Sequence, residues 1–328
     1  MRDDTATLHA IAEAAAGRHL IFTGMGSSYD ACYPAVTELA QAGIPATMLD
    51  AAELLHFRTA IAGRDALLVA ISQSGESAEL VRVAERVRGG ESPPLVVAIT
   101  NGTQNSLARL ADHVLDTRAG RETGPSTMTF AGSLVVAAAV GRVLAGVDPG
   151  SVAGRLDQTT EVAAVAAERL LAETDLADEL ADWFGGPETA VILGRGPARA
   201  AAEMGALTVK EAVGVPIESL QTAQFRHGPL ELVGPGLAAI VIATEPETLE
   251  IDLGLTEELV TAGARVLLVT AGERATHGAR TIAIGPLDRA LSPAVSIVPI
   301  QLLAWRLAAR RGREPGAYYR ATKVTTHE

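Results

Sequence analysis

Short apolar runs alternate along the chain with longer segments in which apolar residues recur at every third or fourth position. The short runs predict buried β-strands, and the longer spacing predicts amphipathic helices. In the first half the strand-like runs are His19–Thr23, Ala46–Leu49, Leu67–Ile71, Leu95–Ile99 and Val114–Asp116. Strands that alternate with helices predict βαβ units and a parallel sheet, with sites at the carboxyl ends of the strands.

Helical spacing fills the segments between these strands and continues after them. The main expected helices cover 4–17, 26–43, 107–111, 130–144 and 152–171. The clearest break in the chain is Val147-Asp148-Pro149-Gly150, because Pro and Gly interrupt regular structure there. We therefore expect a first domain at 1–149, a linker helix at 150–172, a second domain at 173–312 and a tail at 313–328.

The second half repeats the first. Leu193-Gly194-Arg195-Gly196 matches Thr23-Gly24-Met25-Gly26, and the run Leu237–Ala243 ends at Thr244 as Leu67–Ile71 ends at Ser72. The intervals from glycine to hydroxyl are 48 residues (72 − 24) and 50 residues (244 − 194). Val266–Thr270 and Thr281–Ile284 continue the correspondence with the last two strands of the first half. The fold class is thus α/β, with two units related by internal duplication.

A polar loop follows the central strand of the first copy. Leu67–Ile71 stops at Ser72-Gln73-Ser74-Gly75-Glu76-Ser77, and helical spacing resumes at Ala78. Hydroxyls, a glutamine and the amides of a first helical turn would meet there, where the helix dipole favours negative charge. The GxxxxGK(S/T) lysine and a complete GxGxxG are both missing, so a nucleotide motif does not fit. The loop predicts a phosphate monoester site; the alternative is a serine-rich helix cap.

The second copy lacks this loop. It has Thr244-Glu245-Pro246-Glu247 instead, whose acids would repel phosphate and whose proline has no amide donor. We expect an anion site in the first copy alone.

Composition narrows the class of protein. The chain has 328 residues, 48% of them hydrophobic, a net charge of −12 and one cysteine, Cys32. The acidic balance argues against nucleic acid or an anionic membrane as the partner. The single cysteine excludes an intrachain disulfide, and we expect it to be a small core residue. No signal peptide and no apolar run of membrane-spanning length are recognised, so we expect a cytoplasmic protein.

The serine loop, together with Gly24-Met25-Gly26-Ser27-Ser28, resembles the sugar-phosphate-binding loops of SIS (sugar isomerase) domains. Over most of its length the chain is similar to the isomerase half of glucosamine-6-phosphate synthase. This resemblance implies two SIS domains, each a three-layer αβα sandwich around a parallel sheet. It assigns the phosphate to Ser27, Ser28, Ser72, Gln73, Ser74 and Ser77, and the sugar to Gly26, Ser126 and Thr127.

Three further segments carry the resemblance. Lys210-Glu211 and Phe225-Arg226-His227-Gly228-Pro229-Leu230 look like the K-E and K-H-G-P-L segments of that family, with the same interval of 16 residues (227 − 211). Lys323, five residues before the end (328 − 323), resembles the lysine of that family's tail. By resemblance Glu211 moves a proton between C1 and C2, His227 assists ring opening, and Lys323 meets the open-chain carbonyl as a nucleophilic amine.

Taken without the resemblance, each of these residues has a plainer interpretation. Glu211 ends a mostly apolar helix, where burial would raise the pKa of its carboxyl group, but it could equally be an exposed acid paired with Lys210 or Arg226. His227 could be an ordinary surface histidine and Lys323 a solvated charge. The resemblance favours the catalytic interpretation of all three.

The chain also departs from the synthase. Thr208 and Met128 stand where that family has lysines, and no cysteine lies near residue 1, so we expect no glutaminase activity. Isomerisation, deamination or deglycation of a hexose or amino-sugar 6-phosphate, glucosamine-6-phosphate- or fructosamine-6-phosphate-like, is the leading hypothesis. A sugar-phosphate sensor without turnover is the alternative.

We expect neither a cofactor nor a bound metal, because the seven histidines are scattered without an HxH or HxxH pair. A metal-dependent isomerase is a weaker third possibility. The expected ligand is a small sugar phosphate, and the resemblance implies a homodimer with a shared active site, to which His227 comes from a neighbouring copy.

Overall fold

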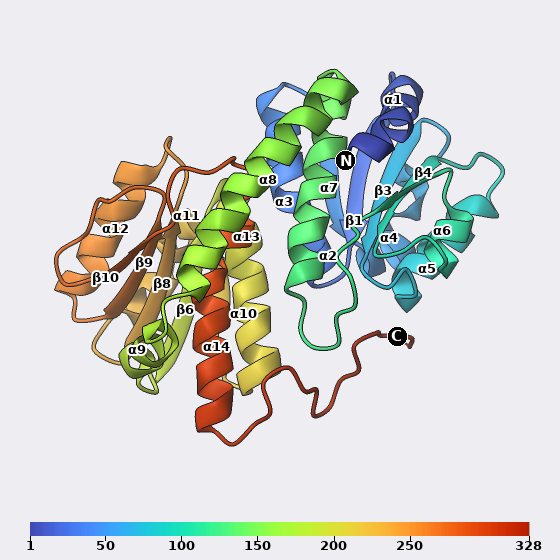
Figure 1. Cartoon of the computed structure of the whole chain (residues 1–328). Coiled ribbons are helices and arrows are strands. Elements are labelled where there is room, and N and C mark those ends of the chain that lie inside the picture. The colour runs from blue at the N-terminus through green and yellow to red at the C-terminus, as the bar shows by residue number, and fades with distance from the viewer. Residues whose placement is uncertain (328) are drawn as a thin grey trace. The chain divides into compact units, whose positions relative to one another are not determined.

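The computed structural model describes residues 1–327 and divides into two compact units (Figure 1). The first unit comprises Met1–Thr160 and Arg320–Glu328, and the second comprises Glu161–Tyr319. The division falls inside helix α8 (Pro149–Leu171), within the range expected for a linker helix. The tail from Arg320 onward belongs to the first unit, although the whole of the second unit precedes it in sequence. Glu328, which ends the expected tail, lies outside the described residues.

The first unit is built on a sheet of five parallel strands in the order β2-β1-β3-β4-β5. These strands are β1 (His19–Gly24), β2 (Ala46–Asp50), β3 (Ala66–Ser72), β4 (Leu95–Thr100) and β5 (His113–Asp116). The apolar runs predicted all five to within one residue at either end. Every residue of the central strand β3 is buried, as expected for a strand covered on both faces.

Helices cover both faces of this sheet. On one face α4 (Ala51–Phe57), α5 (Ala78–Arg88) and α6 (Ser106–Leu110) pack on side chains such as Ile21 and Leu68. On the other face α1 (Thr5–Ala14), α3 (Cys32–Gln41) and α7 (Met128–Leu144) pack together. The result is a three-layer αβα sandwich, as predicted.

The second unit has the same topology. Its five parallel strands follow the order β7-β6-β8-β9-β10, which corresponds strand by strand to the first sheet. They are β6 (Thr189–Gly194), β7 (Glu218–Gln221), β8 (Leu237–Ala243), β9 (Arg265–Thr270) and β10 (Arg280–Ala283). Helices α11 (Thr222–Phe225) and α12 (Leu249–Thr261) cover one face, while α9 (Leu176–Phe184), α10 (Arg199–Val213) and α14 (Val298–Arg310) pack on the other side.

One backbone constraint is the same in both units. A Cβ on Gly24 would lie 2.7 Å from the Ser28 carbonyl carbon, and a Cβ on Gly194 would lie 2.8 Å from the Ala198 carbonyl oxygen. Each glycine lets the turn after the strand press against the strand end. Two residues later Gly26 and Gly196 have φ of 52° and 54°, a region that side chains disfavour. The duplicated glycine pattern therefore has a structural cause.

Three features differ from the expectations. The helix expected at 26–43 is broken at Ala31 into α2 (Ser27–Asp30) and α3. Strand β7 was not predicted, because it is a short edge strand with few apolar residues. The helical stretch Ser292–Arg310, formed by α13 (Ser292–Ser296) and α14, is long and apolar enough to span a membrane by length and composition, so the expectation that no run reaches that length was wrong. Of its most apolar window, 61% is buried inside the protein, where α14 packs on α9 and α10.

Cys32 provides a test of the first core. It is fully buried at the start of α3, and burial raises the pKa of its thiol far above the usual range, with a further contribution from the charge of Asp30. We expect a disulfide reagent such as 5,5′-dithiobis(2-nitrobenzoate) to react with Cys32 in the folded protein on the order of a thousandfold more slowly than in urea.

Trp183 and Trp305 both lie in the second unit, so their fluorescence reports unfolding of that unit separately. Rapid stoichiometric labelling of Cys32 while the tryptophan signal remains native would contradict the predicted packing of α3.

Candidate active site

The position expected to bind a ligand is the carboxyl ends of β1 and β3. From β1 the chain passes outward to β2 and then returns across β1 to β3, so the connections after β1 and β3 diverge. In open α/β sheets ligands bind at this topological switch point. Both segments that carry the predicted phosphate ligands, the turn at Gly26-Ser27-Ser28 and the serine loop at 72–77, follow these two strands.

Serine hydroxyl groups form hydrogen bonds within the serine loop. Ser72 is 1% exposed, and its Oγ accepts a hydrogen bond from the Gly75 amide at 3.1 Å and lies 3.2 Å from Ser77 Oγ. Ser74 Oγ accepts from the Glu76 amide at 3.1 Å. Gly75 has φ of 65°, which lets the chain reverse before α5 begins.

The next loop of the sheet holds the serine loop from one side. The carbonyl oxygens of Gln73 and Gly75 accept from the amides of Asn101 and Leu107, each at 3.0 Å. Glu76 Oε1 accepts from the Ser106 amide at 2.8 Å, and this bond, with the Ser106 side chain, holds the pKa of Glu76 below its ordinary value. Because C=O and N–H point to opposite sides of a trans peptide, the Ser74 amide is directed away from the loop at 101–107. The direction of the Ser74 amide is thus fixed before any ligand binds.

The turn after β1 contacts the loop before α7 through Ser27 and Ser126. Ser28 is 7% exposed in α2, the short helix opened by Gly26. Ser27 Oγ donates to Ser126 Oγ at 3.0 Å, although the two residues are 99 positions apart. Ser126 precedes α7, and Thr127 is exposed at the N-cap of that helix.

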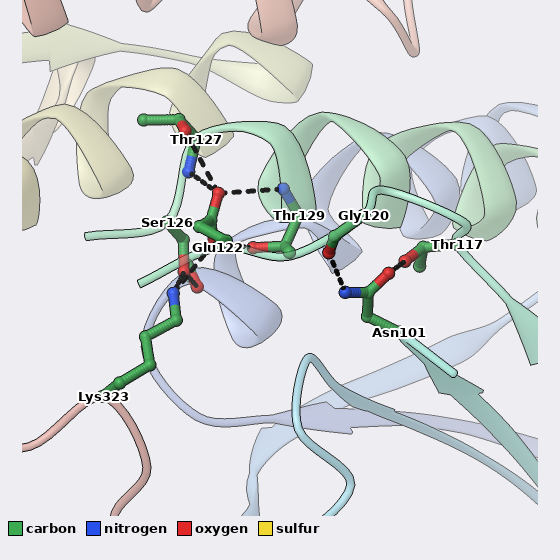
Figure 2. Close-up of polar contacts among 9 residues, drawn as sticks. Asn101, Thr117, Gly120, Glu122, Ser126, Thr127, Thr129 and Lys323 are labelled. Carbon is green, nitrogen blue, oxygen red and sulfur yellow. Dashed lines mark hydrogen bonds and ion pairs between the residues drawn. The ribbon is translucent and has the colours of Figure 1, made fainter. Parts of the chain in front are cut away.

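Lys323, in the tail, contacts the loop before α7. Its Nζ donates to Glu122 Oε2 at 2.8 Å and to Ser126 Oγ at 3.3 Å (Figure 2). Two residues later the Thr325 carbonyl accepts from the Ala78 amide, at the first residue of α5, at 3.1 Å. The tail is therefore bonded both to the loop before α7 and to the helix that follows the serine loop.

Glu122 was missed by the sequence analysis. Besides Lys323, its carboxylate accepts from the Thr127 amide at 2.8 Å, from the Thr129 amide at 3.2 Å and from both threonine hydroxyls (Figure 2). Burial raises the pKa of Glu122, but the hydrogen bonds from Lys323, Thr129 and Thr127 and the charge of Lys323 outweigh burial and hold the pKa below its ordinary value. The dipole of α7 favours a carboxylate at this end of the helix.

Asn101 connects the two loops and was also missed. Its amide donates to Gln73 O, while its side-chain Oδ1 accepts from Thr117 Oγ1 at 3.0 Å and its Nδ2 donates to the Gly120 carbonyl at 2.7 Å (Figure 2). One residue after β4 thus fixes both the serine loop and the segment that leads to Glu122.

The remaining predicted catalytic residues belong to the second unit. Glu211 is half-buried in the last turn of α10. His227 is exposed in the turn after α11, where Gly228 has φ of 121°. Arg226, a possible partner of Glu211, instead donates from both terminal nitrogens to Glu258, at 2.6 and 3.0 Å. The residues gathered around Lys323 all come from the first unit.

The switch point of the second unit is filled by ion pairs. Arg195, directly after β6, lies 2.7 Å from Asp252 of α12, which is fully buried. Glu245, directly after Thr244, lies 2.9 Å from Arg289 and is also buried. Burial raises the pKa of both acids, and the adjacent arginines offset this only in part. These carboxylates take the position at the sheet edge that the serine hydroxyls have in the first unit.

No group of three or more His, Cys, Asp or Glu side chains suited to holding a metal ion occurs within residues 1–327.

Comparison with known proteins matches both halves of the chain to one family. Residues 15–141 and 186–311 each match the SIS domain. A glutamine–fructose-6-phosphate aminotransferase (isomerizing) from Pyrococcus horikoshii is 31% identical over 318 residues, which cover 94% of this chain and 52% of that protein. One from Methanothermobacter thermautotrophicus is 32% identical over 293 residues, 87% of this chain and 48% of that protein. The chain thus spans about half the length of these curated relatives.

Solved structures agree on the fold. The C-terminal domain of glucosamine-fructose-6-phosphate aminotransferase from Francisella tularensis aligns with a TM-score of 0.83 and 24% identity, covering 95% of this chain and 89% of that one.

Gly75 offers a test of the loop geometry. A Cβ there would lie 2.0 Å from Asn105 Oδ1, which caps α6 by accepting from the Ala108 amide at 2.8 Å. Gly75→Ala should lower the free energy of unfolding by about 3 kcal/mol, through left-handed backbone strain and a displaced cap.

Gly102→Ala is the matched control. Gly102 also has positive φ, but no atom lies within 4 Å of its Cβ position, so about 1–2 kcal/mol of backbone strain is the whole expected cost. Urea unfolding followed by Cys32 labelling measures both in the first unit. Equal losses in the two variants would contradict the close contact between Gly75 and Asn105.

Proposed function

The chain belongs to the SIS domain family, and from this we propose that it is an enzyme acting on a hexose or amino-sugar 6-phosphate by proton transfer between C1 and C2. The single observation that carries the proposal is the position of Lys323. A tail amine, 18% exposed, is held 3.3 Å from Ser126 in the same unit as the serine loop. Phosphate capture by the serine loop alone would not need an amine held at Ser126.

The first unit supplies phosphate binding in this proposal. The hydroxyls of Ser72, Ser74 and Ser77 and the Ser74 amide would offer neutral donors to a dianion, and the dipole of α5 favours negative charge at this end of the helix. Ser28 and Gln73 would add donors at the two sides. Binding the phosphate at C6 fixes the sugar at a point remote from the reacting carbons, so that binding energy is used for orientation.

Lys323 would then meet the carbonyl of the open-chain sugar. In its neutral form the nitrogen lone pair forms the C–N bond and the carbonyl π pair moves to oxygen. The nitrogen gives up its two protons and the oxygen takes up two, so that the C–O bond breaks, water leaves and an imine remains. The sugar would be lined by residues near this amine. Ser126 contacts the amine, Ser27 contacts Ser126, and Thr127 and Gly26 are their neighbours in sequence.

Glu211 and His227 complete the proposal through the family resemblance. One carboxylate can serve both C1 and C2, because the carbons are adjacent, and the imidazole would transfer a proton to the ring oxygen during opening. We place them in a homodimer in which His227 comes from a neighbouring copy.

The departures from the synthase favour isomerisation, deamination or deglycation over amination from glutamine. Thr208 is a buried helix residue whose hydroxyl donates to the Met204 carbonyl at 2.9 Å, and Met128 is half-exposed at the start of α7. Neither supplies the amine that the synthase has there.

The test is carbon-bound proton exchange. The protein is incubated in D₂O with glucosamine 6-phosphate, or with fructose 6-phosphate and ammonia, and the C1 and C2 protons are followed by NMR. We expect exchange at C1 or C2, and a loss of at least about 100-fold in Glu211→Gln, since general acid–base groups contribute that much. Glu257→Gln, an exposed helical acid of the same unit, is the matched control and should exchange at the normal rate.

Binding of the sugar phosphate without exchange, unchanged in Glu211→Gln, would overturn the enzyme proposal and leave a sugar-phosphate sensor.

A further inference from the structure

The Lys323 amine faces one charged group. Glu122 Oε2 lies 2.8 Å from its Nζ, and the two side chains are 5% and 18% exposed, so water screens this pair poorly. The other polar atom in reach, Ser126 Oγ, is neutral. On the α5 side the tail meets the Ala78 amide through Thr325, which adds no ionisable group. Within residues 1–327, Glu122 is therefore the acid that forms an ion pair with Lys323.

Glu122 is itself held from the opposite side. The amides and hydroxyls of Thr127 and Thr129 donate to its carboxylate, and the segment before it is fixed by Asn101. Its position does not depend on Lys323, so it can determine where the lysine lies.

Lysine is nearly absent from the chain. Of 27 lysine and arginine residues, two are lysines, Lys210 and Lys323. Arginine serves as the cation almost everywhere else, including the ion pairs of the second unit. An arginine at 323 could also pair with a carboxylate, but its guanidinium does not lose a proton. A primary amine at this position indicates that the neutral form has a use.

We propose that Glu122 is a positioning residue that holds the Lys323 amine beside the sugar site through their ion pair. The role in turnover rests on the function proposed above, whereas the ion pair does not. Before the amine attacks a carbonyl, the ammonium ion gives its proton to solvent water; Glu122 stays ionised, in keeping with its lowered pKa.

The small number of lysines makes a direct measurement possible. Reductive ¹³C-methylation labels three amines, those of Met1, Lys210 and Lys323, and Lys210→Arg assigns the spectrum. In Glu122→Gln, which keeps an oxygen for the threonine donors, we expect the titration midpoint of Lys323 to fall by about one pH unit, because an adjacent opposite charge has been removed. Glu122→Asp keeps the charge and should restore most of the shift.

Asp50→Asn is the matched control. Asp50 also caps a helix of the first unit, accepting from the Glu53 amide at 2.9 Å, whereas the ion pair of Lys323 within residues 1–327 is with Glu122. It should leave the Lys323 midpoint unchanged. An unchanged midpoint in Glu122→Gln, or an equal shift in Asp50→Asn, would overturn the proposal.

A second experiment measures the pH dependence of kcat/KM for proton exchange. The rising limb that reports the neutral amine should move to lower pH by the same amount in Glu122→Gln as the NMR midpoint. A shifted midpoint with an unmoved limb would overturn the role of Glu122 in turnover. If the wild-type protein shows no exchange at all, the proposed function fails, and the NMR titration alone decides the ion pair.

Discussion

The candidate site depends on two backbone hydrogen bonds that hold the serine loop against the next loop of the sheet. The carbonyls of Gln73 and Gly75 are taken by the amides of Asn101 and Leu107, so the loop does not have to reorganise its carbonyls when an anion arrives. Gly75 permits this because its left-handed backbone lies against Asn105, where a side chain has no room. A preorganised set of neutral donors matters in a chain of net charge −12, since an anion must bind locally against the overall field.

The same constraint extends to the tail. Asn101 fixes the segment that leads to Glu122, Glu122 holds Lys323, and Thr325 returns to the start of α5. A continuous series of bonds therefore connects the loop after β3 with the last residues that the structure describes. An amine from a distant point in sequence is thereby held next to the residues of the first unit's candidate site.

The two units share one fold but carry different polar residues at the ends of their strands. Gly24 and Gly194 impose the same close turn after the first strand of each copy. After the central strand, however, the first copy has hydroxyls and the second has Glu245, paired with Arg289, near the Arg195–Asp252 pair. These arginines are already paired with buried carboxylates, and the carboxylates repel a phosphate. We therefore expect no phosphate to bind there. The second unit keeps the fold without the serine loop. It carries Glu211 and His227, for which a catalytic role is proposed above.

The sequence predicted the five strands of the first sheet and β8, β9 and β10 of the second, because a buried parallel strand is a continuous apolar run with sharp ends. Strand β6 was indicated by the repeat of the glycine pattern at its end alone. The edge strand β7 buries too little to leave an apolar run. The break at Ala31 does have a local signal, Pro34, which lacks the N–H that would bond the Asp30 carbonyl and is tolerated only in the first turn of a helix. The serine loop was found because its hydroxyls adjoin in sequence. Glu122 and Asn101 were missed because their partners, Lys323 and Gln73, are distant along the chain, and single-sequence patterns carry no such pairing.

The most direct test of the central claim is a crystal structure of the protein soaked with glucose 6-phosphate. The account predicts a phosphate group within hydrogen-bond distance of the Ser72, Ser74 and Ser77 hydroxyls in the first unit, and none at the carboxyl ends of β6 and β8. A phosphate bound at the second switch point, or a serine loop left empty at saturating ligand, would contradict it.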